Sequence, residues 1–100
     1  MNILEEIVTR KLQEVEKQSM IIPIERLKSS QRLFAIRNFK KALKGNEIKI
    51  IAEIKRRSPS EKDIMMDADP VQVSISYQLN GAAAISILTD QHYFGGHLNF

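Results

Sequence analysis

The sequence predicts an α/β fold built on a parallel βαβ unit, and three stretches carry that prediction. Residues 48–55 are rich in isoleucine, as expected of a strand buried in a parallel sheet. Residues 69–80 have the composition of a capped helix, and a second apolar run occupies residues 83–88. A strand, a helix and a strand in this order join two parallel strands through a right-handed crossover.

Two further helices are predicted ahead of this unit. Residues 3–17 place apolar side chains on one stripe at helical spacing, with charged side chains opposite. A connector at residues 19–25, broken by Pro23, leads to a second helix over residues 30–44. Lysines gather in the last turn of that helix, where they suit the negative end of its dipole, and Gly45 ends it.

The first predicted strand ends in two charged residues, Glu53 and Lys55. Because side chains alternate along a strand, these two point to one face, while Ala52 and Ile54 point to the other. The carboxyl end of a parallel strand is where α/β proteins place their chemistry. A half-exposed salt bridge is the alternative interpretation of the pair, and the spacing alone does not decide between them.

The rest of the unit follows from turn and capping residues. We expect a loop over residues 56–68 and then a helix with Asp69 as its cap and Pro70 in its first turn. Asn80-Gly81 closes this helix, and a second loop, residues 89–96, follows the second strand. The helix has one apolar side, formed by Val71, Ile75 and Leu79.

Composition excludes several classes of protein. The 100 residues are 43% hydrophobic and 27% charged, as in ordinary globular domains. They contain no cysteine, so this chain has no disulfide framework, Cys-based zinc site or thiol nucleophile. No apolar run approaches the roughly 20 residues that cross a bilayer, and the N-terminus lacks a signal-peptide core. We therefore expect a cytoplasmic protein that does not associate with membranes.

The net charge of +3 favours an anionic small molecule over nucleic acid as ligand. The basic clusters lack the interleaved aromatic residues on which bases would stack. We expect Arg56 and Arg57 to be solvated surface residues, although they could also attract an anion. His92 and His97 have no acidic or cysteine partner at ligand spacing, so we expect no metal site.

Three motifs carry a resemblance to a known family. The chain reads I-A-E-I-K-R-R-S-P-S, then A-D-P, then G-A-A-A-I-S-I-L-T-D-Q-H-Y-F-G-G, and it closely resembles the indole-3-glycerol phosphate synthases. The resemblance implies the N-terminal portion of a (β/α)8 TIM barrel, consisting of N-terminal helices and a βαβ unit with two parallel strands. Residues 1–47 would be a helical extension, and residues 48–100 the first two strands and first crossover helix.

The resemblance also implies an activity and a site. The family is a carbon–carbon lyase of tryptophan biosynthesis, which closes an indole ring on 1-(2-carboxyphenylamino)-1-deoxyribulose 5-phosphate with loss of carbon dioxide and water, and without a cofactor or metal. It implies catalytic roles for Glu53 and Lys55 and substrate binding by Ser58 and Phe94. By themselves, Ser58 would indicate turn chemistry, Phe94 packing, and Gly95-Gly96 a turn.

Two departures from the family pattern bear on these expectations. Glu61-Lys62-Asp63 stands where the family usually has a glycine after Ser58-Pro59-Ser60. A barrel of this kind needs at least about 200 residues, so a third-strand lysine and a fourth-strand glutamate that the family uses are absent. We expect a fragment that is inactive alone. The alternative is a non-catalytic fragment that self-associates or complements the missing part of a barrel.

Overall fold

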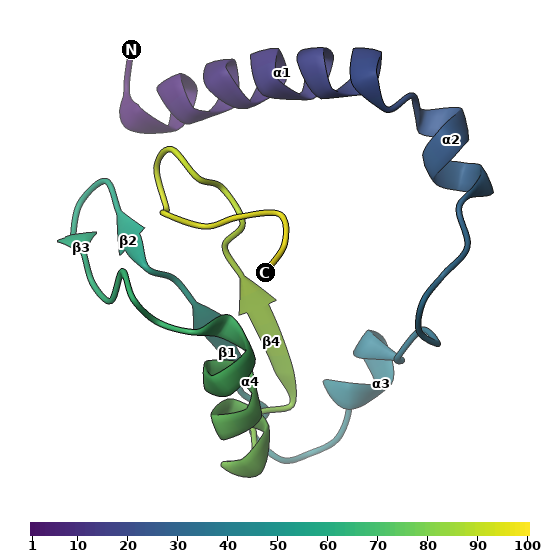
Figure 1. Ribbon diagram of the computed structural model, residues 1–100. Helices are drawn as coiled ribbons and strands as arrows, with labels where there is room; N and C mark the ends of the chain where they lie inside the picture. The colour runs from purple at the N-terminus through teal and green to yellow at the C-terminus, as the bar shows by residue number, and fades with distance from the viewer. The chain divides into compact units, whose positions relative to one another are not determined.

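A computed structural model describes residues 1–100 and confirms the α/β class. The elements, in chain order, are α1 (Ile3–Ile21), α2 (Ile24–Ser29), α3 (Phe39–Ala42), β1 (Ile51–Ile54), β2 (Arg57–Ser58), β3 (Lys62–Asp63), α4 (Pro70–Leu79) and β4 (Ala84–Ile87) (Figure 1). They form two compact units, Met1–Ile36 and Arg37–Phe100. None of the helices combines the length and apolar character that crossing a bilayer requires. The predicted division between residues 47 and 48 stays a prediction.

The first unit consists of α1 and α2. The helix predicted over residues 3–17 is confirmed, and it continues to Ile21. The side chain of Asn2 accepts a hydrogen bond from the amide of Glu5 at 2.8 Å, which satisfies a donor that the first turn leaves free. Most apolar side chains of α1 are exposed. This helix is therefore stabilised mainly by its cap and by surface pairs such as Arg10–Glu14, at 3.1 Å.

The predicted connector and second helix are wrong in extent. The connector is mostly helical, because α1 continues into it and α2 begins directly after Pro23. Residues 30–38 are not helical, and only Phe39–Ala42 of the helix predicted over residues 30–44 is found, as α3.

Polar side chains interrupt the helix predicted over residues 30–44. The hydroxyl of Ser30 donates to the carbonyl of Leu27 at 2.6 Å where α2 ends. The side chain of Asn38 accepts from the amide of Lys41 at 2.9 Å and starts α3. Burial does not compensate for these local competitors, since Phe34, an apolar residue of this segment, is 77% exposed.

The second unit contains the predicted βαβ arrangement. β1 and β4 pair in parallel, with Ile51 beside Ala84 and Ile54 beside Ile87. Both strands are shorter than the apolar runs that predicted them, but the amide of Leu88 still donates to the carbonyl of Ile54 at 3.0 Å. The strands therefore remain together up to their carboxyl ends, where the two following loops begin.

α4 begins as predicted and packs on one face of the sheet (Figure 1). Its cap, Asp69, accepts from the amide of Val71 at 3.0 Å, and Pro70 is its first residue. Ile54, on the covered face, is 4% exposed and is the only buried apolar residue of the chain. Ile51 alternates to the other face and is 51% exposed, so that face is open.

The apolar side predicted for α4, Val71, Ile75 and Leu79, is exposed and lies opposite the half-buried Val73 and Tyr77. Tyr77 reaches β1, where its hydroxyl donates to the carbonyl of Glu53 at 2.8 Å. The carbonyls of Ile50 and Ile54 both accept from the β4 side. Since carbonyl directions alternate along a strand, the Glu53 carbonyl lies on the free edge of β1.

Replacing Tyr77 by phenylalanine should weaken the attachment of α4 to β1. The lost hydrogen bond is worth about 0.5–1.5 kcal/mol, so amide exchange in β1 should accelerate by up to about tenfold. Hydrogen-exchange NMR measures this change, with the exposed Gln72→Ala variant of the same helix as control. Unchanged β1 exchange in the Tyr77→Phe protein would show that the hydroxyl contributes nothing.

The predicted loop over residues 56–68 contains a small antiparallel hairpin. β2 and β3 pair Arg57 with Asp63 and Ser58 with Lys62. Lys62 has a φ of 58°, in the left-handed region that favours glycine. Lys62 therefore adopts a backbone conformation that is better suited to glycine.

Replacing Lys62 by glycine should stabilise this hairpin. Left-handed backbone costs a residue with a side chain about 1–2 kcal/mol, and the greater freedom of unfolded glycine offsets about 0.4–1 kcal/mol of that gain. Exchange of the hairpin amides should slow several-fold. Lys62→Ala removes the charge but keeps the strain, so it should not slow exchange. Equal behaviour of the two variants would contradict the role assigned to φ.

Candidate functional site

The acidic and basic side chains at the end of β1 lie together, as the alternation predicted. Lys55 Nζ is 3.7 Å from Glu53 Oε1. Their side chains are 30% and 47% exposed, on the side of the sheet that α4 does not cover. A pair this exposed adds little stability. Both groups are therefore accessible to a ligand at the carboxyl end of the sheet.

Ser58 lies in β2 and is 7% exposed. Its Oγ accepts from the amide of Glu61 at 3.0 Å and lies 3.5 Å from Ser60 Oγ. This hydroxyl therefore closes the turn of the hairpin, as the local sequence indicated. The bond from Glu61 uses only an oxygen lone pair, so the hydroxyl proton can be donated to Ser60 Oγ or to another acceptor.

Phe94 lies in the loop that follows β4, and this loop touches the hairpin. The amide of Arg57 donates to the carbonyl of Phe94 at 3.4 Å. The turn that carries Phe94 is closed by the amides of Gly95 and Gly96, which donate to Gln91 and Asp90 carbonyls at 3.1 and 2.8 Å. This agrees with the prediction that the two glycines form a turn.

The expectation that Arg56 and Arg57 are solvated is wrong, since both are half-buried. Arg56 Nη2 donates to the carbonyl of Ala68 at 2.5 Å, and its guanidinium lies 4.5 Å from the centre of the Phe100 ring. Its Nε is buried without a hydrogen bond. Arg57 Nη2 donates to the carbonyl of His92 in the loop after β4. The two arginines hold different loops.

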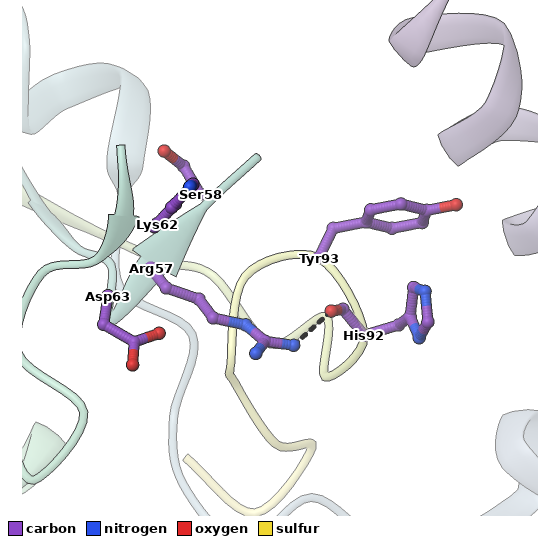
Figure 2. A pocket seen from close by; sticks show the side chains of 6 residues that line it. All are labelled: Arg57, Ser58, Lys62, Asp63, His92 and Tyr93. Atoms are coloured by element: carbon purple, nitrogen blue, oxygen red, sulfur yellow. Dashed lines mark hydrogen bonds between the residues drawn. The ribbon is translucent and has the colours of Figure 1, made fainter. Parts of the chain in front are cut away.

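A shallow pocket of about 620 Å³ lies between the hairpin and the loop after β4 (Figure 2). Its lining residues are Arg57, Ser58, Lys62, Asp63, His92 and Tyr93. Of the four site residues expected from the sequence, the pocket therefore includes Ser58 but not Glu53, Lys55 or Phe94. The structure contains no group of three or more His, Cys, Asp or Glu side chains that could hold a metal ion.

Tyr77 and Arg57 are the structural residues that sequence reasoning missed. The available signal for Tyr77 was an aromatic residue with a polar tip within the predicted crossover helix. Arg57 gave no comparable signal, because its acceptors are backbone carbonyls more than thirty residues away. The sequence identifies an arginine as charged, but it does not indicate which backbone carbonyl accepts a hydrogen bond from it.

Comparison with known proteins confirms the resemblance. Residues 4–100 match the family described as indole-3-glycerol phosphate synthase. Relatives of that name from Bacteroides thetaiotaomicron, Dehalococcoides mccartyi and Leptospira interrogans are 45%, 40% and 42% identical over 98, 99 and 96 residues. The matches cover 97%, 97% and 96% of this chain but only 38%, 38% and 35% of the relatives. The chain belongs to the indole-3-glycerol phosphate synthase family.

Proposed function

We propose that this chain supplies the first two strands of a (β/α)8 barrel that closes the indole ring of indole-3-glycerol phosphate. The substrate is 1-(2-carboxyphenylamino)-1-deoxyribulose 5-phosphate, and the reaction releases carbon dioxide and water. The observation that carries the proposal is the pair Glu53 and Lys55, whose charged atoms lie 3.7 Å apart at the carboxyl end of β1. The exposed side of the sheet on which they lie becomes the interior of the barrel.

Lys55 meets two demands of this reaction. Ring closure requires an acid that protonates the carbonyl attacked by the aromatic ring and later assists the departure of a hydroxyl group. It also requires a cation that binds the substrate carboxylate. An ammonium group can do either. Glu53 orients Lys55 through their ion pair and accepts hydrogen bonds from the substrate amine or hydroxyls.

Ser58 and Phe94 are proposed to contact the substrate from the two loops. The Ser58 hydroxyl donates a hydrogen bond to a substrate oxygen while its own oxygen accepts from Glu61. Phe94 forms one wall of an apolar slot for the anthranilate ring. Support comes from the contact between the two loops, since the residue before Ser58 donates its amide to the Phe94 carbonyl.

The 100 residues alone should not turn over substrate. The resemblance assigns the principal acid and a further glutamate to later strands, and groups that act as a unit are not compensated when members are missing. The direct test joins residues 1–100 to the part of the Bacteroides thetaiotaomicron relative that follows its matched region. The joined protein should produce indole fluorescence from the substrate, whereas residues 1–100 alone should not.

The controls separate failure to fold from failure to react. The intact Bacteroides relative fixes the expected rate, and circular dichroism with size-exclusion chromatography establishes that the joined barrel is folded. A folded, monodisperse barrel without activity, repeated with the Leptospira interrogans relative, would refute the proposal.

A second candidate function, self-association or fragment complementation without catalysis, is favoured by the sheet itself. It has only two strands, so each has an unpaired edge. The face opposite α4 is open, with Ile51 51% exposed. Sedimentation of residues 1–100 should then show dimers or larger species at micromolar concentration. This candidate would be excluded if residues 1–100 were strictly monomeric and also did not bind the C-terminal part of a relative.

A further inference from the structure

We propose that Arg57 is a positioning residue that fixes the loop after β4 and thereby the ring of Phe94. The inference extends the proposed function, because it matters to catalysis only if Phe94 contacts substrate. The resemblance assigns no role to this arginine. Its contacts, rather than its charge, indicate what it does.

Arg57 holds the loop through both backbone and side chain. Its amide donates to the carbonyl of Phe94 at 3.4 Å. Its Nη2 donates to the carbonyl of His92 and, at 3.4 Å, to that of Gln91. Figure 2 shows the guanidinium reaching from the hairpin to the His92 carbonyl, while the His92 and Tyr93 side chains point away from the hairpin. Three backbone carbonyls of this loop, those of Gln91, His92 and Phe94, thus accept hydrogen bonds from one residue.

The stem of Arg57 also packs against this loop. A methyl group placed on Gly95 would lie 3.2 Å from Arg57 Cγ, tighter than an ordinary contact. Gly95 has a φ of 64°, so a residue with a side chain is disfavoured there for two reasons. Close approach of the stem and charged hydrogen bonds from the tip together restrain the residue that follows Phe94 and those that precede it.

The hairpin holds the backbone of Arg57 in place. Arg57 pairs with Asp63 across the hairpin, and the carbonyl of Arg56 accepts from the amides of Ile64 and Met65 at 2.8 and 2.9 Å. The Nη2 group of this guanidinium engages two carbonyls of the loop, which favours a positioning role over the capture of an anion. A lysine could also reach a carbonyl, but its three donors lie on one nitrogen at the end of a flexible stem and lack the planar fork of arginine.

Arg56 offers a matched control within the same dipeptide. It has the same charge and similar burial, but its guanidinium binds the carbonyl of Ala68 in its own loop. Removing the Arg56 side chain should loosen residues 65–68. Removing the Arg57 side chain should loosen residues 91–96. Two chemically identical substitutions should therefore loosen two different segments of the chain.

The test is hydrogen-exchange NMR on residues 1–100 carrying Arg57→Gln, Arg57→Lys or Arg56→Gln. In Arg57→Gln the amides of Tyr93, Gly95 and Gly96 should exchange about tenfold faster or more, as loss of a charged hydrogen bond implies, and the Phe94 ring resonances should shift. Amides of β1 and β4 should keep their protection. Arg57→Lys should rescue part of the effect.

Three outcomes would overturn the inference. They are unchanged exchange over residues 91–96 in Arg57→Gln, the same change in Arg56→Gln, and a uniform acceleration of every amide, which would indicate a general structural role. Kinetics of the joined barrel test the function separately. If Arg57→Gln loosens the loop but leaves KM and kcat unchanged, the role proposed for Phe94 fails while the positioning of the loop by Arg57 stands.

Discussion

Replacing Lys55 by methionine in the joined barrel should lower kcat/KM by about 10²–10⁴-fold, the usual contribution of a positioned acid or base. Methionine keeps most of the length of the side chain and removes both the charge and the proton. In residues 1–100 the structural cost should be small, because the ion pair with Glu53 spans 3.7 Å between side chains that are 30% and 47% exposed. Indole fluorescence measures the rate, and unfolding of the joined barrel by heat measures the structural cost.

Lys55→Arg separates the two roles proposed for Lys55. Arginine retains the positive charge but does not give up a proton at accessible pH. If Lys55 is the acid, kcat should fall in Lys55→Arg while KM changes little; if it only binds the carboxylate, arginine should restore both constants. The control is Lys62→Met, which replaces a lysine of the hairpin. Retention of activity within about threefold in Lys55→Met would remove this residue from the mechanism.

Replacing Gly96 by alanine should disrupt the loop after β4. A Cβ on Gly96 would lie 2.0 Å from the carbonyl oxygen of Leu88 and 2.8 Å from the carbonyl carbons of Leu88 and Thr89. These are backbone atoms of the two residues that follow β4, so they cannot rotate away as a side chain can. Overpacking of this kind costs about 1–3 kcal/mol or more. The loop should leave its present path, with Phe94 displaced and activity of the joined barrel lost.

Gly81→Ala is the matched control for this prediction. Gly81 has a φ of 92°, but nothing lies within 4 Å of the position its Cβ would take. Its substitution therefore tests backbone strain without a clash, and its effect should remain at the end of α4. Amide chemical shifts of residues 89–97 report the result. Native-like shifts in Gly96→Ala would mean that Leu88 does not set the path of the loop.

How much the sequence could predict depends on the range of the interaction concerned. Glu53 and Lys55 were placed on one face by alternation alone, and Asp69-Pro70 fixed the start of α4, because both are local rules. The helix predicted over residues 30–44 does not form, because the large apolar side chains of this segment are exposed and the hydrogen bonds of Ser30 and Asn38 decide the backbone.

The candidate site shows the same limit. The alternation rule brings Glu53 and Lys55 together, but nothing in the sequence indicates that the Ser58 hydroxyl is engaged by the Glu61 amide. The bridge from Arg57 to the carbonyl of His92 is likewise a contact between distant segments. It depends on how two loops meet after the strands have paired, which charge and spacing do not specify.

Burial of a single apolar side chain, Ile54, has a consequence for how the isolated chain melts. Heat-capacity change and denaturant sensitivity both scale with the area exposed on unfolding, so both should be small here. The 100 residues should therefore lose structure gradually over a wide temperature range. A sharp, cooperative transition is expected to appear only when further strands flank β1 and β4.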